Sequence, residues 1–292
     1  MVPIRDKPEL IKHETGALTS CKWRLDALTG LRFFAAAAIV LHHLPGTFGI
    51  EHGYLGDARL AQGVSVFFVL SGFVLRYAYP QLGSMREVRQ FLVARVARIW
   101  PLHVLTLLAA VLIRGYPEIW TFLANFFLLQ SWIPKGIYFF GYNSVSWSIS
   151  TEFAFYLAFP VLLLHFRHDW WWKLLACATV SFAIALYVGA MGVPEFDGNM
   201  KTVVMQGFIM SNPVARLFEF VLGMACAQLW LGTTPRGGTA VWTALELAAV
   251  AFLLLNVSII LYTIIPLLPA TIPVRFWAAL IASPALPVAI LL

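Results

Sequence analysis

Charged residues are scarce in this sequence. Of its 292 residues, 12% are charged and 60% are hydrophobic, whereas an ordinary soluble domain has about 25% charged and roughly 45–50% apolar residues. A soluble core does not need so large an apolar fraction, and the composition therefore excludes an ordinary soluble globular fold. The apolar residues predict instead a protein that crosses a lipid bilayer many times.

Cysteine is also rare. The three cysteines, Cys21, Cys177 and Cys226, lack the spacing of a metal site, and the first of them lies in a polar N-terminal segment. A disulfide framework or a zinc site is therefore not expected, and we predict no bound metal or cofactor.

Periodic repeats, low-complexity linkers and a recognisable secretory signal are absent as well. Residues 1–22 are polar and mixed in charge, without the basic start and cleavage site of such a signal, so the first apolar helix is expected to direct insertion. We predict a cytoplasmic tail over residues 1–22 and one transmembrane domain over residues 23–292.

Long apolar runs are what the sequence does have. A helix that crosses a bilayer needs about 20 apolar residues, and nine runs are candidates: 28–45, 62–79, 99–114, 119–133, 147–166, 170–190, 213–232, 240–264 and 272–292. The fourth is short and contains Asn125, Gln130 and Ser131, so it either crosses or is a re-entrant segment enclosed by protein. The expected fold class is all-α, a polytopic transmembrane helical bundle with eight or nine spans.

The basic residues indicate a membrane topology. The net charge is +6, but these residues do not form one patch suited to a nucleic acid backbone. The cluster after the second span comprises Arg76, Arg86, Arg89, Arg95 and Arg98. The positive-inside rule places this cluster, and with it the N-terminus, in the cytoplasm of a cell membrane, the inner or plasma membrane. The loop 189–212 is then external if the fourth segment is re-entrant, and internal if that segment crosses.

The first span carries two ionisable residues on one helix face. Arg32 and His43 are eleven residues apart, which is three turns plus about 20°. Ionisable groups within a membrane usually face a cavity or a partner, so the pair is a candidate site. Imidazole exchanges protons near neutral pH, which suits a general base. The alternative is that both side chains lie at the helix ends and reach to the interface.

Two further segments carry residues that suit a phosphate site or close helix packing. Arg95 and Arg98 lie one turn apart before Pro101 and could hold phosphates through bidentate hydrogen bonds, or simply anchor the helix at the membrane surface. In the second span, Gly63, Ser71 and Gly72 are small enough for another helix to approach closely, and this favours a packing role. Ser65 on the same span is a further candidate site residue.

The fifth and seventh spans contain carboxylates. Ser148, Glu152 and Tyr156 recur every four residues and form a polar stripe on an apolar helix. A carboxylate in lipid needs a partner, so Glu152 either has a functional role or forms a structural pair with an arginine. Arg216 and Glu219, at i and i+3, are interpreted first as a structural ion pair.

Several elements occur in a fixed order along residues 24–230. They are Arg32 with ten residues before His43, GVSVFFVLSGFVL, Arg95-x-x-Arg98-Ile-Trp-Pro, Trp147-Ser-Ile-Ser-Thr-Glu152-Phe-Ala-Phe-Tyr156, and Arg216-x-x-Glu219-Phe-x-x-Gly223. Together they resemble the acyltransferase 3 family, which comprises multi-pass membrane enzymes, mainly bacterial. The family transfers acetyl or other short acyl groups to hydroxyls of surface polysaccharides, lipopolysaccharide, peptidoglycan sugars, macrolides and related glycosides.

The resemblance implies roles for these residues. The donor would be an acyl-CoA such as acetyl-CoA, used as a co-substrate, with its phosphates at Arg95, Arg98 and Arg32. His43 would deprotonate the acceptor hydroxyl or accept the acyl group transiently, while Glu152 would orient the imidazole or pair with an arginine. The remaining candidates, Ser65, Ser148, Tyr156, Arg216 and Glu219, would support the substrate or the structure.

The sequence departs from the family pattern in two places. Family members commonly carry an acidic residue at the position of Ser65, and they usually have ten spans. Because the sequence stops at Leu292 within an apolar run, we expect it to be truncated.

Two other classes of protein remain alternatives. A transporter or flippase would use the intramembrane polar residues to line a path, although no inverted repeat is found. A non-catalytic membrane scaffold would leave the polar stripes unexplained.

Overall fold

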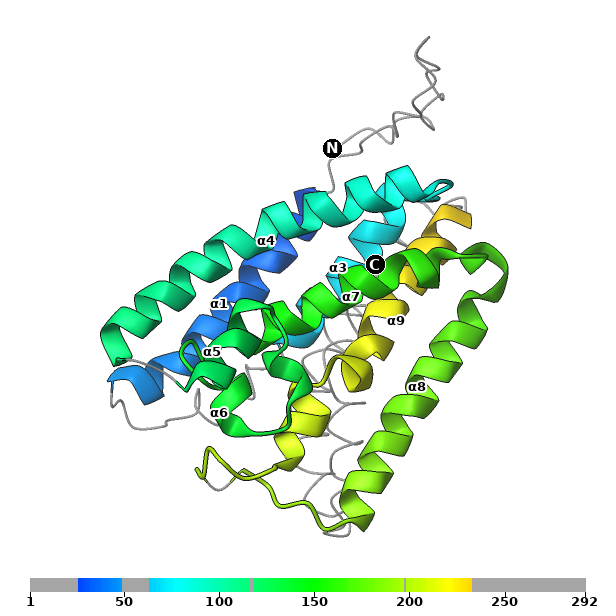
Figure 1. The fold of residues 1–292 in the computed structure, drawn as a ribbon. Coiled ribbons are helices and arrows are strands. Elements are labelled where there is room, and N and C mark those ends of the chain that lie inside the picture. The colour runs from blue at the N-terminus through cyan, green and yellow to red at the C-terminus, as the bar shows by residue number, and fades with distance from the viewer. Residues whose placement is uncertain (1–25, 49–62, 116–117, 197, 233–292) are drawn as a thin grey trace.

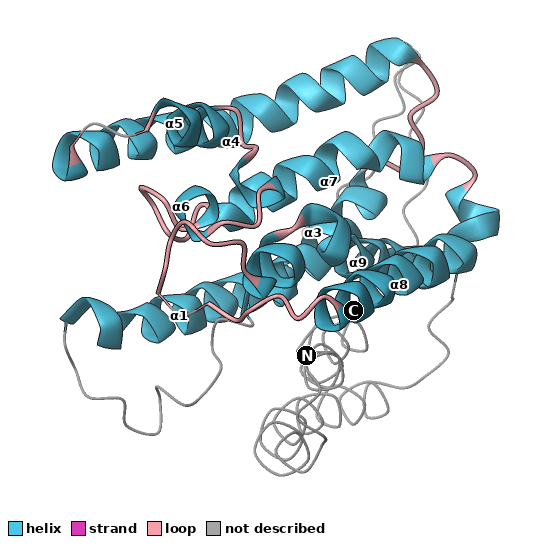
Figure 2. Ribbon diagram, turned by 60° about the horizontal axis from the view of Figure 1, so that its bottom comes forward, coloured by secondary structure: helices cyan, strands magenta, loops and turns pink. Residues whose placement is uncertain are grey.

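The computed structural model describes residues 26–48, 63–115, 118–196 and 198–232. Its α-helices are α1 (Asp26–Phe48), α3 (Gly63–Ala78), α4 (Met85–Arg114), α5 (Ile119–Phe126), α6 (Gly136–Phe139), α7 (Trp147–Leu163), α8 (Phe166–Ala190) and α9 (Pro213–Gly232), with a 3₁₀ turn at Gln130–Trp132 and a π-helical turn at Gly207–Ser211. Figure 2 shows helices joined by loops. Across the described ranges the fold is all-α, as predicted, and the β-type pairing found there is a bridge between Lys135 and Val203.

Six helices correspond to predicted spans. Three segments are long and apolar enough to cross a membrane: 85–113, 166–190 and 207–232. Three shorter apolar helices cover 28–43, 63–78 and 147–163. Helix α4 begins at Met85, well before the predicted start at residue 99, because the amphipathic segment before Pro101 continues the same helix. The predicted spans 240–264 and 272–292 lie outside the described residues.

The predicted fourth span, 119–133, is not one continuous helix. Helix α5 has eight residues, which is about 12 Å and far short of the ~30 Å of bilayer hydrocarbon. The polar residues in this segment satisfy loop and helix-end groups: Gln130 Nε2 donates to the Ser146 carbonyl at 3.2 Å, and Ser131 Oγ lies 2.7 Å from Ser150 Oγ. Of the two alternatives, the structure therefore favours a segment that stays at one end of the bundle.

Helices α3 and α9 form the tightest contact of the bundle, and they run parallel. Ser65 near the start of α3 bonds Arg216 near the start of α9, and Arg76 in the last turn of α3 bonds Gln228 near the end of α9. A Cβ added at Gly72 would lie 1.9 Å from the Phe220 carbonyl oxygen. Close approach of the two backbones thus requires glycine, as the packing interpretation of this span predicted.

Helices α1, α4 and α8 run in the opposite direction to α3, α7 and α9 (Figure 1). Phe91 near the start of α4 stacks against Phe159 near the end of α7, while Ala185 and Val188 near the end of α8 pack with the segment that precedes α9. We call the end that holds Ala78, Met85, Leu163 and Phe166 the basic end, since Arg76, Arg86, Arg89 and Arg167 lie there. The opposite end, with residues 118–146 and 191–212, is the loop end.

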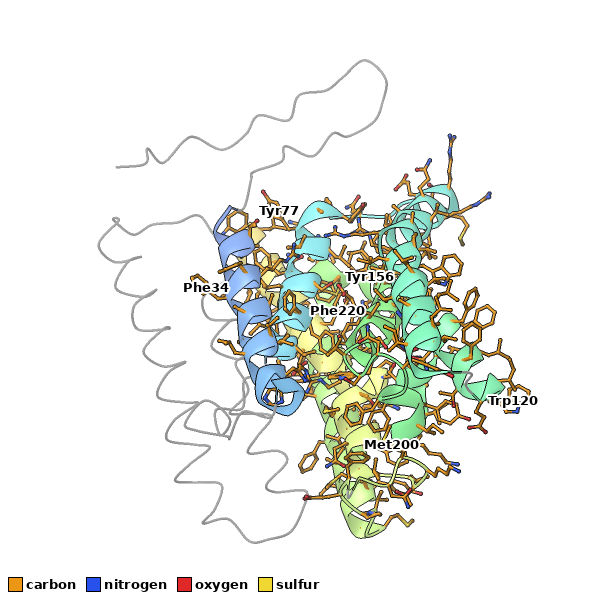
Figure 3. All side chains as sticks on the ribbon, turned by 90° about the vertical axis from the view of Figure 1, so that its left-hand side faces the viewer. Phe34, Tyr77, Trp120, Tyr156, Met200 and Phe220 are labelled. Atoms are coloured by element: carbon orange, nitrogen blue, oxygen red, sulfur yellow. The ribbon has the colours of Figure 1, made fainter. Side chains whose placement is uncertain are left out.

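Aromatic side chains fill the space between α3, α7 and α9. Phe155 and Phe220 stack with their ring centroids 5.1 Å apart. In Figure 3, Tyr156 and Phe220 lie inside the bundle, whereas Phe34 and Trp120 project outward. The two outward rings are 70% and 66% exposed. Exposed apolar rings on helix exteriors are expected where the surrounding medium is lipid.

Candidate functional site

Glu152 lies in the middle of α7 and accepts two hydrogen bonds from neighbouring side chains. Ser71 Oγ on α3 donates to Oε1 at 3.0 Å, and the Tyr156 hydroxyl, one turn further along α7, donates to the same oxygen at 2.5 Å. The four-residue spacing places Tyr156 directly beside Glu152 on the helix face. Ser71 was interpreted from the sequence as a packing residue, and the structure adds a polar role to that interpretation.

Three arginines on two other helices are connected to this carboxylate or to its tyrosine partner, Arg98 through Arg32. Arg32 on α1 is within Coulombic range of Arg98 on α4 and of Glu152 and Tyr156 on α7. The Arg95 guanidinium lies 5.9 Å from the centre of the Tyr156 ring. We call the set Arg32, Ser71, Arg95, Arg98, Glu152 and Tyr156 the arginine–glutamate cluster.

Arg95 is held mainly by aromatic rings. Its guanidinium lies 5.5 Å from the centre of the Phe91 ring and 5.7 Å from that of Tyr79, and Nη2 donates to the Tyr79 hydroxyl at 3.1 Å. Such cation–π contacts stabilise a charge without neutralising it. Its Nε has no hydrogen-bond partner among the described residues. Arg95 thus retains donor capacity, and its charge is not cancelled by that tyrosine.

His43 lies apart from this cluster. The carbonyl of Ala35 and the side chain of Ile39 face Gly63 at the start of α3, so α1 runs toward the loop end. His43 is one turn beyond Ile39 and eleven residues beyond Arg32, or about 16 Å along the axis. Glu152 is therefore level with Arg32 and not with His43. Of the two roles considered for Glu152, this arrangement favours pairing with an arginine.

The other predicted carboxylate forms the expected ion pair. Arg216 Nη2 lies 2.9 Å from Glu219 Oε2 and donates to Ser65 Oγ at 2.9 Å. Glu219 is fully buried, and its charge is compensated within α9 itself. Ser65 thus has a defined partner at the position where the family commonly carries an acidic residue. A carboxylate there would face the same guanidinium.

Ser148 is not part of the arginine–glutamate cluster. Its hydroxyl donates at 2.9 Å to the carbonyl of Val145, which lies just before its own helix. The polar stripe predicted on α7 therefore divides into a helix-end contact at Ser148 and the buried contacts of Glu152 and Tyr156.

The sequence analysis missed a second set of buried polar residues near the loop end. His103 Nε2 lies 2.8 Å from the Asn125 carbonyl, Ser150 Oγ donates to the Leu128 carbonyl at 2.6 Å, and Thr151 Oγ1 reaches the Ser211 carbonyl at 2.7 Å. The polar residues of the broken fourth span were the available signal. These contacts fasten the loop segments to α4 and α7.

Among the described residues, no group of three or more His, Cys, Asp or Glu side chains is arranged to hold a metal ion. The described site therefore consists of cations, one hydrogen-bonded carboxylate and hydroxyls. Such a set suits binding of a phosphorylated, anionic ligand.

Taken together, antiparallel apolar helices with a partly buried arginine–glutamate cluster among them define a membrane protein with a polar site between its helices. The chain belongs to a family of acyltransferases, because the family described as an acyltransferase domain matches residues 25–292. No solved structure matches the chain.

Individual relatives agree with the family. The chain is 36% identical over 251 residues to the acyltransferase MdmB of Streptomyces mycarofaciens, covering 77% of this chain and 62% of that protein. It is 25% identical to the putative peptidoglycan O-acetyltransferase YrhL of Bacillus subtilis strain 168, covering 70% of this chain and 33% of the relative.

A third relative is the peptidoglycan O-acetyltransferase OatA of Listeria monocytogenes, 25% identical over 228 residues, which covers 70% of this chain and 34% of that protein. The chain thus spans less than two thirds of the length of each of these three relatives.

Proposed function

We propose that this protein is a membrane-bound O-acyltransferase that moves an acetyl or other short acyl group from an acyl-CoA to a hydroxyl of a carbohydrate. The acceptor class is a surface polysaccharide, lipopolysaccharide, peptidoglycan sugar or related glycoside. Family membership supports acyl transfer, and two relatives are named for O-acetylation of peptidoglycan.

The observation that carries the proposal is the grouping of Arg32, Arg95 and Arg98. Arg32 on α1 is 63 or more positions from Arg95 and Arg98 on α4, yet it is within Coulombic range of Arg98 and of Glu152, and Arg95 lies over the ring of Tyr156. Guanidinium groups bind phosphates through bidentate, charge-assisted hydrogen bonds. The cluster would hold the phosphates of acyl-CoA, and Glu152 would keep Arg32 in position.

His43 would then act on the acyl end of the donor. It lies about 16 Å from Arg32 along α1, a distance that a pantetheine arm can span. His43 would take the proton of the acceptor hydroxyl, whose oxygen attacks the thioester carbonyl. The carbon–sulfur bond breaks, and the CoA thiolate leaves with the proton that His43 returns.

The proposed orientation follows from the charge distribution. The basic end would face the cytoplasm, where acyl-CoA is made, and the loop end with His43 would face outward, in the cell membrane. The donor would enter from the basic end and the carbohydrate from the loop end.

The decisive experiment uses the 292-residue chain purified in detergent, supplied with labelled acetyl-CoA and a panel of peptidoglycan fragments and polysaccharides. We expect labelled product from the unmodified protein and a fall of about 10³-fold for His43→Ala. His42→Ala is the matched control, because its ring packs edge-on against that of His43 and its removal tests the effect of local packing. Equal rates for His43→Ala and the unmodified protein would refute the assignment of His43.

The same assay distinguishes direct transfer from an acyl-histidine intermediate. Without acceptor, a covalent route leaves label on His43, whereas direct transfer leaves none. Retention of label by a His43→Ala variant would show that another nucleophile is used.

A further inference from the structure

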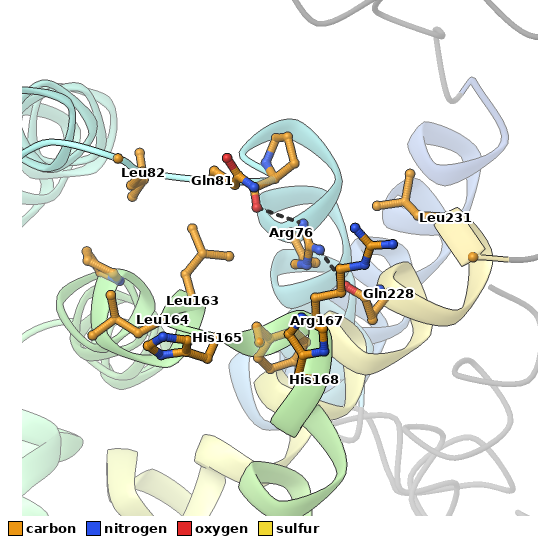
Figure 4. Close-up of a pocket in the computed structure, with 15 residues that line it drawn as sticks. Arg76, Gln81, Leu82, Leu163, Leu164, His165, Arg167, His168, Gln228 and Leu231 are labelled. Atoms are coloured by element: carbon orange, nitrogen blue, oxygen red, sulfur yellow. Dashed lines mark hydrogen bonds between the residues drawn. The ribbon is translucent and has the colours of Figure 1, made fainter.

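A cavity of about 690 Å³ opens at the basic end (Figure 4), and none of the arginine–glutamate cluster residues lines it. Its walls are the end of α3 with the loop that follows it, the end of α7 with the turn into α8, and the end of α9. Ligand pockets are commonly about 300–1,000 Å³. The cavity is therefore large enough for a phosphate group and the moiety attached to it.

Arg76 provides a buried positive charge in the wall of this cavity. Its side chain belongs to the last turn of α3 and is 5% exposed. Nη1 donates to the Pro80 carbonyl at 3.2 Å and Nη2 donates to Gln228 Oε1, so both partners are neutral. Nε has no partner among the described residues. Burial of a charge is costly unless an opposite charge accompanies it.

The remaining ionisable side chains of the wall are also positive or become positive on protonation. Arg167 is the charged neighbour that acts on Arg76, and it has the same sign. His165 and His168 line the cavity beside it, and no described lining residue is acidic. Asp169, the nearest acid in sequence, is paired with Lys173 at 2.9 Å.

The backbone adds to this positive character. The cavity faces the first turn of α8, a helix of 25 residues, whose N-terminal amide groups favour an anion. His165 caps this helix with φ 55°, in the left-handed region, where histidine is one of the more frequent non-glycine residues. This sharp turn brings α7 and the start of α8 to the same wall.

We propose that the cavity lined by Arg76, Arg167, His165 and His168 binds a phosphomonoester. Such a group carries nearly two negative charges at neutral pH and would compensate the buried guanidinium. Two sources share this chemistry: the 3′-phosphate of coenzyme A, and the headgroup of an acidic phospholipid such as phosphatidic acid. The first source rests on the proposed function, and the second does not.

The location is compatible with the first source. Pro160 in the cavity wall lies one turn beyond Tyr156 on α7, and Pro80 follows Tyr79, which bonds Arg95. The cavity thus borders the arginine–glutamate cluster on its basic side. One ligand with two separated phosphate positions could use both sites, with its diphosphate at Arg95 and Arg98 and its 3′-phosphate in the cavity.

The test compares coenzyme A with 3′-dephospho-coenzyme A, using the chain in phosphatidylcholine nanodiscs and calorimetry for the dissociation constants. We expect loss of the 3′-phosphate to weaken binding about tenfold. Arg167→Ala should remove this difference, and Arg76→Gln should reduce it. Arg86→Ala is the matched control, because Arg86 is exposed at the same end and does not line the cavity.

A second arm adds phosphatidic acid to the nanodiscs and measures thermal stability. An increase that depends on Arg167 supports the lipid source, even where coenzyme A neither binds nor reacts. Equal affinity for both nucleotides, with no Arg167-dependent effect of phosphatidic acid, overturns the cavity proposal. Acyl transfer observed together with that result would leave the proposed function standing.

Discussion

Glu152 illustrates how single residues set the chemistry of this bundle. Its carboxylate accepts hydrogen bonds from Ser71 and Tyr156 and lies within Coulombic range of Arg32. Hydrogen bonds and nearby positive charge are what make a carboxylate tolerable in an apolar interior. Its position level with Arg32, which is three turns from His43 on α1, favours the proposed role of pairing with an arginine.

Glu152→Gln should therefore impair acyl transfer while preserving the fold. The amide keeps the shape of the side chain and an oxygen that accepts from Ser71, but it removes the negative charge that attracts Arg32. We expect acyl transfer from labelled acetyl-CoA to fall by about 10²-fold, with a raised KM for the donor.

Ser148→Ala is the control for this experiment. The described hydrogen bond of the Ser148 hydroxyl goes to the Val145 carbonyl, outside the arginine–glutamate cluster. The acyl-transfer rate of this variant should therefore stay within about twofold of the unmodified protein. A Glu152→Gln variant with unchanged KM and rate would contradict the positioning role.

The Arg216–Glu219 pair allows a test of stability. Removal of one partner from a buried ion pair leaves an uncompensated charge and costs roughly 3–5 kcal/mol. We expect Arg216→Leu and Glu219→Leu each to lower the thermal midpoint in detergent more than the double replacement does.

Additive losses in the double variant would argue against the pairing. Ser65→Ala should lower the thermal midpoint less than either single replacement of the ion pair. It removes one hydrogen bond from Arg216, and such a bond to a charged group contributes about 1.5–3 kcal/mol.

At the scale of elements, the contact between α3 and α9 depends on two glycines. A Cβ at Gly72 or at Gly223 would lie 1.9 Å from a carbonyl oxygen of the opposite helix. The helix backbones would have to separate, and overpacking of this kind costs about 1–3 kcal/mol or more. We expect Gly223→Ala to lower the thermal midpoint of the purified protein.

Gly30→Ala is the matched control, since a Cβ at Gly30 in α1 meets no described atom within 4 Å. Alanine is the better helix former by about 1 kcal/mol, so this variant should be as stable as the unmodified protein or more so. Equal behaviour of the two variants would show that the α3–α9 contact tolerates extra volume.

At the scale of the whole molecule, the proposed topology can be tested by labelling in intact cells. In a background with all three cysteines replaced by serine, Arg89→Cys lies at the basic end and Lys201→Cys at the loop end, and both positions are exposed. If the basic end faces the cytoplasm, a maleimide that cannot cross membranes should label Lys201→Cys only.

Label on Arg89→Cys and not on Lys201→Cys would show that the basic end faces outward, which contradicts the proposed topology. Permeabilised cells provide the control, because both positions should then react.

Most of the described membrane helices were predictable from local information. A run of about 20 apolar residues suffices to predict a membrane helix, and the span predicted at 213–232 coincides with α9. The spacing of Arg216 and Glu219 was also enough to predict their ion pair, since residues three apart face each other on a helix.

Contacts between helices could not be predicted in this way. Ser71 and Glu152 are 81 positions apart, and Arg76 and Gln228 are 152 apart. Hydropathy along the chain predicts which segments form membrane helices, but it does not predict which faces of those helices contact one another. The broken segment at 119–133 was left open for the same reason, because its polar residues become satisfied only by groups from other segments.

The amino-acid sequence by itself therefore determined the all-α membrane character, the family motifs and the basic end, because each depends on composition or on short spacings along the chain. Tertiary packing decided that Glu152 is level with Arg32 and not with His43, and that Arg76 and Arg167 share one cavity. The physical reason is that these sites arise where helices distant in sequence meet, and the rotation and depth of each helix are set by packing against its neighbours.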